Sequence, residues 1–326
     1  MAGFLLTGGA GFIGSHLAER LLGRGDRVVI LDNFDPFYDP AIKRDNLAKA
    51  LAHPACTLVE GDIRDAETVE TILKKERFDA VIHLAARAGV RPSIAEPVLY
   101  TDVNLRGTSV LLESCRKIGL KRFIFGSSSS VYGDSNKVPF SEDDPVARPV
   151  SPYAATKAAG ELLCHAYHHV HGFDVTCLRF FTVYGPRQRP EMAIHKFARH
   201  ILEGEPIPRF GDGSSVRDYT YIDDIIDGVA KAIDRAGGYR IYNLGESEPV
   251  PLSRLIELIE KEIGVAARVE SLPDQPGDVR ATWADVSRAR RDLGYEPCVP
   301  IAEGIRRFVI WLKAQRAGAA RGGGLA

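Results

Sequence analysis

Two residues that could move a proton stand four positions apart in one predicted helix. Tyr153 and Lys157 belong to the stretch S-P-Y-A-A-T-K at residues 151–157, and that spacing places both side chains on one helix face. A phenol has an ordinary pKa of about 10 and is no base at neutral pH, but a neighbouring ammonium group stabilises the phenolate and lowers its pKa. Four serines, 127–130, end the strand predicted before this helix. The pattern indicates abstraction of a proton from a hydroxyl group.

A glycine-rich turn predicts which cofactor binds beside Tyr153 and Lys157. Gly8, Gly11 and Gly14 stand between a predicted strand and a predicted helix, where glycine lets the backbone approach a pyrophosphate and the helix N-terminus attracts its charge. Asp32 ends the next predicted strand, and its carboxylate would accept hydrogen bonds from ribose hydroxyls and repel a 2′-phosphate. We therefore expect NAD rather than NADP. Its positive nicotinamide ring would favour the phenolate form of Tyr153 further.

The elements that must position these residues follow an alternating pattern. Short apolar runs typical of buried parallel strands fall at 4–6, 27–31, 57–59, 80–84, 122–125 and 175–180, with one more at 240–244. Helical stretches fall between them at about 12–24, 66–76 and 98–118, and a further helix begins near Tyr153. Alternation of this kind implies right-handed crossovers. The predicted fold is α/β, a doubly wound parallel sheet of the Rossmann type with a smaller, mixed C-terminal substrate lobe.

The pattern becomes irregular, and richer in Gly and Pro, after the Y-G-P at 184–186. We expect an NAD-binding domain over 1–182, joined by about 214–246. A substrate-binding lobe is expected over 183–213 and 247–318, with two helical stretches after residue 250, and a disordered tail over 319–326.

Composition restricts the class of protein. The 326 residues carry a net charge of −1, which gives no general attraction to nucleic acid or to an anionic membrane. No run approaches membrane-spanning length. Five cysteines in no C-x-x-C pair indicate free thiols in a reducing cytoplasm and no zinc site. Four histidines, at 165, 168, 169 and 171, are interpreted as a partly solvated helix end rather than a metal site.

Several motifs together resemble one family. They are T-G-G-A-G-F-I-G at 7–14, L-D-N at 31–33, G-D-I-R-D at 61–65, H-L-A-A at 83–86, S-S-S-S-V-Y-G at 127–133, S-P-Y-A-A-T-K at 151–157 and R-D-Y-T-Y-I-D-D at 217–224. The chain resembles the extended short-chain dehydrogenase/reductases, the NAD-dependent sugar-nucleotide epimerases and dehydratases, over nearly its whole length. The resemblance implies that Tyr153 is the base, that Lys157 tunes it and anchors the nicotinamide ribose, and that Ser128 bonds the reacting sugar hydroxyl.

The positions of the strand ends and the resemblance to the family together predict which residues contact the cofactor and the substrate. For the cofactor they are Gly8, Gly11, Phe12, Ile13, Gly14, Asp32, Asn33, Asp62, Ile63, Leu84, Ala85, Ala86, Asn104, Tyr153 and Lys157. For the substrate they are Ser127, Ser128, Ser129, Thr182, Arg189, Arg217, Asp278 and Arg91. By resemblance, Arg217 meets a nucleotide diphosphate and Asp278 the nucleotide ribose, but Gln275 departs from the arginine common in the galactose-type enzymes.

The residues after Ser128 favour one reaction within the family. The 4,6-dehydratases carry an Asp-Glu pair there and the uronate decarboxylases a Glu, whereas this chain has Ser129 and Ser130. Neither serine is a general acid or base at neutral pH. We therefore expect hydride transfer from C4 of a UDP-sugar and its simple return to the opposite face, which is 4-epimerisation.

The segment F-T-V-Y-G-P-R-Q-R-P-E-M-A at 181–193 resembles that of the UDP-glucuronate 4-epimerases. Because Arg pairs with carboxylates bidentately, Arg189 with Thr182 is the expected clamp for the uronate, and Ser127 and Arg91 are further candidates. The sequence leaves open whether Arg187 is a solvated loop residue or has a function. The rival readings are UDP-glucose/UDP-galactose epimerisation, decarboxylation of UDP-glucuronate, and a non-catalytic NAD sensor or scaffold. The family also implies a homodimer through the helices near 98–118 and 152–171.

Overall fold

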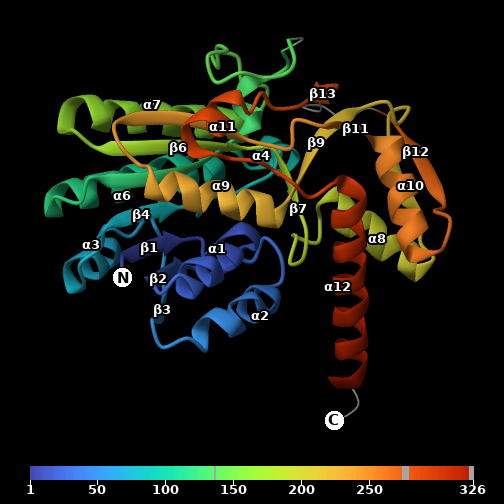
Figure 1. Ribbon diagram of the computed structural model, residues 1–326, viewed down its shortest axis with the longest axis horizontal. Helices are drawn as coiled ribbons and strands as arrows, with labels where there is room; N and C mark the ends of the chain where they lie inside the picture. The colour runs from blue at the N-terminus through green and yellow to red at the C-terminus, as the bar shows by residue number, and fades with distance from the viewer. Residues whose placement is uncertain (136, 274–278, 323–326) are drawn as a thin grey trace.

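A seven-stranded, wholly parallel sheet forms the centre of the molecule, with the strand order β10-β6-β5-β4-β1-β2-β3 (Figure 1). The computed structural model describes all residues except 136, 274–278 and 323–326. The strands of this sheet are β1 (Gly3–Thr7), β2 (Arg27–Asp32), β3 (Cys56–Glu60), β4 (Ala80–His83), β5 (Arg122–Ser128), β6 (Asp174–Phe180) and β10 (Tyr239–Leu244).

Both faces of this sheet are buried, which explains its continuous apolar strands. Side chains alternate across a strand, so Phe4 and Leu6 of β1 pack into one hydrophobic cluster while Leu5 between them packs into another. The first cluster includes residues of α1, α2 and α9, and the second includes residues of α3, α6 and α7. The doubly wound architecture expected from the sequence is confirmed.

The helices over the two faces follow the strands in turn. They are α1 (Phe12–Gly23), α2 (Pro40–Leu51), α3 (Ala66–Lys75), α4 (Val90–Ala95), α5 (Pro97–Tyr100), α6 (Gly107–Ile118), α7 (Pro152–His171) and α9 (Ile222–Asp234). Two shorter turns, the π-helix η1 (Thr101–Arg106) and the 3₁₀ turn η2 (Ser129–Tyr132), complete this part.

The start of α7 is defined by its own sequence. Ser151 is the N-cap, and its hydroxyl accepts a hydrogen bond from the Ala154 N–H at 3.1 Å. Pro152 occupies the first helical position, where its missing N–H is not needed. The helix ends at Gly172, which adopts the left-handed conformation. The N-cap fixes the first turn of α7, which carries Tyr153 at the carboxyl edge of the sheet.

The remaining elements form a mixed C-terminal part, seen in yellow to red in Figure 1. A second sheet contains β7 (Thr182–Tyr184), β9 (Val216–Tyr221), β11 (Pro249–Pro251) and β13 (Ala281–Thr282). A third pairs β8 (Ile207–Phe210) with β12 (Val269–Leu272). The helices here are α8 (Ala193–Glu203), α10 (Leu252–Ile263), α11 (Ser287–Leu293) and α12 (Ile301–Gly322). Within the described part of the chain, no helix combines the length and apolarity needed to cross a bilayer.

Some predicted elements differ from the observed ones. The stretch 98–118 is helical throughout, as predicted, but its middle part, η1, is a π-helix between α5 and α6. The helix α2 is missing from the prediction because its exposed face interrupts the apolar pattern. Among the described residues, three helices and not two follow residue 250. The helix α12 continues through 319–322, which the tail was expected to include, because alanine and arginine favour the helix.

Within the segment 214–246, β10 joins the large sheet parallel to β6, whereas β9 joins the second sheet. The segment therefore serves both parts of the molecule.

Candidate active site

A cavity of about 290 Å³ lies at the carboxyl ends of the parallel strands, where ligands bind in open α/β sheets. Of the residues predicted to hold the cofactor, all but one line it: Gly8, Gly11, Phe12, Ile13, Gly14, Asp32, Asn33, Asp62, Ile63, Leu84, Ala85, Ala86, Tyr153 and Lys157. Of those predicted for the substrate, Ser127, Ser128 and Arg189 line it. Residues distant in sequence therefore meet in one site.

The glycine turn after β1 leaves no room for larger residues. Gly8 has a φ of +71°, and a Cβ there would lie 2.6 Å from the Ala85 backbone nitrogen. A Cβ at Gly14 would lie 2.2 Å from the Gly8 carbonyl oxygen. The turn thus packs strand, loop and helix α1 against one another. The same close packing keeps side chains away from the place where a pyrophosphate meets the helix N-terminus.

The cavity lining includes a carboxylate that two backbone N–H groups hold in place. Asp32, at the end of β2, accepts hydrogen bonds from the Ala10 N–H at 3.0 Å and the Phe34 N–H at 2.9 Å. Burial raises the pKa of Asp32 although these bonds oppose the shift. Asn33 beside it donates to Asp62 at 2.9 Å. A glycine turn that lets the backbone approach a pyrophosphate, and a fixed carboxylate that can accept from ribose hydroxyls, fit NAD.

Ser128, Tyr153 and Lys157 meet at the other end of the cavity. Lys157 is buried and donates to the Gly126 carbonyl oxygen at 2.6 Å. Burial lowers the pKa of Lys157 to about 8, and Cys164 and Glu161 oppose that shift. Burial raises the pKa of Tyr153, whereas a hydrogen bond with Ser128 and the positive charge of Arg189 lower it. Ser128 and Arg189 thus favour the phenolate form of Tyr153.

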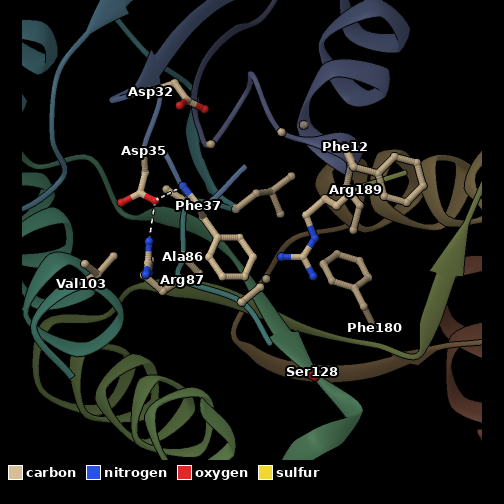
Figure 2. A pocket seen from close by; sticks show the side chains of 18 of the residues that line it. Phe12, Asp32, Asp35, Phe37, Ala86, Arg87, Val103, Ser128, Phe180 and Arg189 are labelled. Atoms are coloured by element: carbon tan, nitrogen blue, oxygen red, sulfur yellow. Dashed lines mark hydrogen bonds and ion pairs between the residues drawn. The ribbon is translucent and has the colours of Figure 1, made fainter. Parts of the chain in front are cut away.

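Arg189 comes from the loop between β7 and α8. Its guanidinium lies 5.7 Å from the centroid of the Phe37 ring and forms a 3.2 Å ion pair with Glu191. Figure 2 shows Arg189 directed into the cavity on the same side as Phe12 and Phe180. The loop is held by its neighbour Gln188, whose side chain donates to the Val183 carbonyl oxygen at 3.1 Å.

Ser127 lines the cavity but its hydroxyl is engaged elsewhere. It donates to Glu161 at 2.5 Å. Glu161 is in turn paired with the buried Arg179, with contacts of 2.9 and 2.7 Å. Because the carboxylate takes the hydroxyl proton, Ser127 has only acceptor capacity left for a ligand in this arrangement. That is a poor match to the expected contact with a uronate carboxylate.

Five residues predicted from the sequence lie outside the lining of this cavity: Ser129, Thr182, Arg91, Arg217 and Asn104. Thr182 begins β7 and pairs with Tyr219 of β9. The Arg91 guanidinium lies 4.2 Å from the centroid of the Phe210 ring. Arg217 donates to the carbonyl oxygens of its neighbours Val216 and Arg280. Asp278 lies outside the described residues.

Asn104 is buried beneath the site instead. Its amide oxygen accepts the Arg87 N–H at 2.7 Å, and its amide nitrogen donates to the Arg87 carbonyl oxygen at 3.0 Å. The same nitrogen donates to Thr156 on α7 at 3.0 Å. Asn104 therefore joins the loop after β4 to the turn of α7 that carries Tyr153.

Further lining residues were not assigned to the site from the sequence: Asp35, Phe37, Tyr38, Lys43, Arg87, Val103, Phe180, Val183 and Met192. The signal for several of them is position, because 35–38 follow the end of β2 and Arg87 follows the end of β4. Loops at these strand ends face the ligand in this architecture. The four clustered histidines at the end of α7 lie outside the cavity lining; His165 stacks on His169 and meets the Tyr239 ring edge-on, and His171 contacts Tyr167.

Comparisons with known proteins agree with this site. The model of the NAD dependent epimerase/dehydratase family matches residues 4–245. A UDP-glucuronate 4-epimerase of Thermodesulfobacterium geofontis is 43% identical over 96% of this chain and 97% of the relative. The solved UDP-glucuronic acid 4-epimerase of Bacillus cereus, in complex with UDP-glucuronic acid and NAD, has a TM-score of 0.91 and 38% identity, over 96% of this chain and 99% of that one.

A UDP-glucose 4-epimerase of Thermotoga maritima, solved with UDP-glucose, has a TM-score of 0.89 and 34% identity over 96% of this chain and 99% of that one. Similarity therefore extends to epimerases of both an acidic and a neutral sugar. With the family model covering the glycine turn, Ser128, Tyr153 and Lys157, the chain belongs to the NAD-dependent epimerase/dehydratase family.

Proposed function

We propose that this protein catalyses the NAD-dependent 4-epimerisation of UDP-glucuronate to UDP-galacturonate through a 4-keto intermediate. One observation carries the proposal: Ser128, Tyr153 and Lys157 line the same cavity as Arg189. Tyr153 can take a proton from a sugar hydroxyl once Ser128 and the Lys157 ammonium stabilise its phenolate. Arg189 is a cation suited to a carboxylate. The UDP-glucuronate epimerases among the similar proteins support the same substrate.

Tyr153, in its phenolate form, is the general base that takes the proton of the sugar 4-hydroxyl. Bound NAD supplies a hydride acceptor in the forward half-reaction and a donor in the return. Ser128 orients the hydroxyl and bonds Tyr153, while the Lys157 ammonium stabilises the phenolate. Once the keto sugar has turned so that C4 presents its opposite face, Tyr153 returns the proton to the 4-oxygen. The cofactor leaves each cycle in its starting state.

Arg189 holds the uronate carboxylate. A 4-keto uronate is a β-keto acid, which loses CO2 when the C–CO2 bond aligns with the carbonyl π system. A bidentate arginine can keep that bond out of alignment. Ser129 and Ser130 offer no acid for elimination or decarboxylation at neutral pH. Arg189 is the preferred clamp because it lines the cavity, whereas Thr182 does not.

The decisive experiment is incubation of the NAD-loaded protein with UDP-glucuronate and with UDP-glucose, followed by NMR of the products. UDP-galacturonate from the first supports the proposal. UDP-galactose from the second with no turnover of the first identifies a neutral-sugar epimerase, and a UDP-pentose identifies a decarboxylase. Bound NAD without turnover of either sugar identifies a sensor or scaffold. A Tyr153→Phe variant is the control and should lose turnover about 100-fold or more while binding NAD.

The remaining nucleotide contacts are also proposals. Arg217 is assigned to the diphosphate and Asp278 to the nucleotide ribose. The proposed division of the chain is an NAD-binding domain over 1–182 with 214–246, and a substrate lobe over 183–213 and 247–318. The third sheet, β8 with β12, lies entirely within the proposed lobe and supports it, whereas the second sheet is centred on β9 of the segment 214–246.

We also propose a homodimer through α5, η1, α6 and α7. Val98 on α5 is 80% exposed, and Leu162 and Val170 on α7 are 68% and 67% exposed, which are large fractions for apolar side chains on helices. Sedimentation of the protein and of a Leu162→Glu variant tests the assembly. The five cysteines are all free thiols, which supports the cytoplasm as the compartment.

A further inference from the structure

We propose that Phe37 is the positioning residue that gives the site its preference for an acidic sugar, because its ring holds the guanidinium of Arg189. The inference rests on the proposed function, since it concerns how the same cavity recognises the uronate. Phe37 belongs to the loop that follows β2, directly after the cofactor residues Asp32 and Asn33.

The ring of Phe37 lies between two guanidinium groups in Figure 2. The Arg87 guanidinium carbon lies 5.0 Å from the ring centroid and that of Arg189 lies 5.7 Å from it. All three residues line the cavity. Both distances are within the range in which an aromatic face attracts a cation. The ring therefore fixes the positions of two positive charges that would otherwise repel each other.

Phe37 is itself held in place. One oxygen of Asp35, Oδ1, accepts the Phe37 N–H at 2.9 Å and Nη1 of Arg87 at 2.6 Å, the two dashed lines in Figure 2. Nζ of Lys43 donates to the Asp35 carbonyl oxygen at 2.6 Å. The backbone of Arg87 is fixed by Asn104, as described above. These hydrogen bonds connect the loop that carries Phe37 to the loop after β4 and so fix the position of its ring.

The two arginines differ in what neutralises them. Arg87 pairs with Asp35 at 2.6 Å and with Glu96 at 2.9 Å, and its side chain is only 11% exposed. Arg189 pairs with Glu191 at 3.2 Å, and the side chain of Glu191 is 41% exposed. Water screens the Glu191 carboxylate, and Glu96 too is 49% exposed, but Arg87 also pairs with Asp35, which is 29% exposed. Arg189 is thus the cation that can exchange its partner for a ligand carboxylate, while Phe37 keeps its flexible side chain directed into the cavity.

The test measures binding of UDP-glucuronate and of UDP-glucose by calorimetry to the NAD-loaded protein and its variants. Phe37→Leu removes the aromatic face and keeps an apolar side chain, and Phe37→Tyr keeps the face. We expect Phe37→Leu to weaken UDP-glucuronate binding about 10-fold and to leave UDP-glucose within about 2-fold. Phe37→Tyr should behave as the unmodified protein. The double variant Phe37→Leu/Arg189→Ala should bind UDP-glucuronate no more weakly than Arg189→Ala.

Phe34→Leu is the matched control. The Phe34 ring faces the Arg44 guanidinium at 4.2 Å, three residues earlier on the same loop, and is not part of the cavity lining. Its loss should leave the preference unchanged. Equal weakening of both sugars by Phe37→Leu, full retention of the preference, or loss of NAD from the Phe37→Leu protein would overturn the proposal. An unmodified protein with no preference for UDP-glucuronate would instead refute the proposed function, and the role of Phe37 with it.

Discussion

The ammonium of Lys157 lies 2.6 Å from the carbonyl oxygen of Gly126, so helix α7 is bound to strand β5 at the turn that carries the reacting groups. One turn further along the same helix face, Glu161 accepts the Ser127 hydroxyl at 2.5 Å. Successive residues of β5 are thus bound by successive turns of α7. Tyr153, one turn before Lys157, is hydrogen-bonded to Ser128, the last residue of β5.

Loss of the Lys157 proton should set the alkaline limit of activity. Burial lowers the pKa of Lys157 to about 8, and only the charged ammonium supports the Tyr153 phenolate. We therefore expect kcat to fall as pH rises through about 8, and full support at lower pH. The measurement is kcat for UDP-sugar epimerisation against pH. In Lys157→Arg, whose guanidinium stays charged, this alkaline limb should move above pH 10 even if the rate is lower. If kcat of Lys157→Arg still falls near pH 8, another group causes the alkaline loss of activity.

Arg189→Ala should raise KM for UDP-glucuronate about 10- to 100-fold, the usual worth of a charge-assisted hydrogen bond. The fraction of UDP-pentose among the products should rise as the carboxylate gains freedom. Product NMR and initial rates measure both effects.

Arg187→Ala is the control for that variant, since Arg187 binds Glu19 on α1 and the Asn46 carbonyl oxygen instead. It should lower the melting temperature slightly and leave KM unchanged. The clamp is refuted if the two variants affect KM alike.

Removal of one partner of the buried Glu161–Arg179 pair should destabilise the fold. Their side chains are 4% and 2% exposed, so Glu161→Ala leaves an unpaired buried charge, at a cost of about 3–5 kcal/mol in the free energy of unfolding. Urea unfolding followed by circular dichroism measures it. The double variant Glu161→Met/Arg179→Met removes both charges and should recover much of the loss. A small loss in Glu161→Ala would mean that water or another group replaces the carboxylate.

Gly14→Ala should abolish NAD binding, because its Cβ would lie 2.2 Å from the Gly8 carbonyl oxygen and neither backbone can move freely. Gly23→Ala, in the same helix, is the matched control, since nothing lies within 4 Å of a Cβ there. It should keep NAD and gain up to about 1 kcal/mol of stability. Fluorescence titration with NADH and thermal unfolding compare the two. Normal NADH affinity in Gly14→Ala would show that the turn tolerates a side chain.

Local patterns in the sequence were sufficient for the parts of the site that sit on regular elements. Spacing alone predicted that Tyr153 and Lys157 share a helix face, because a helix repeats every 3.6 residues. The glycine turn and Asp32 were predictable because both stand at the carboxyl ends of recognisable strands. All of them line the cavity.

Only the tertiary structure decided how the loops meet. Arg189 reaches Phe37 across two loops far apart in the chain, and Ser127 turns its hydroxyl to Glu161. Asn104 lies beneath the cavity and Thr182 beside it rather than in its lining. The direction of a loop side chain depends on which distant partner neutralises it or accepts its proton, and no repeat in the sequence encodes that choice. The sequence by itself therefore determined most of the elements and the shared helix face of Tyr153 and Lys157, and packing decided which loop side chains line the cavity.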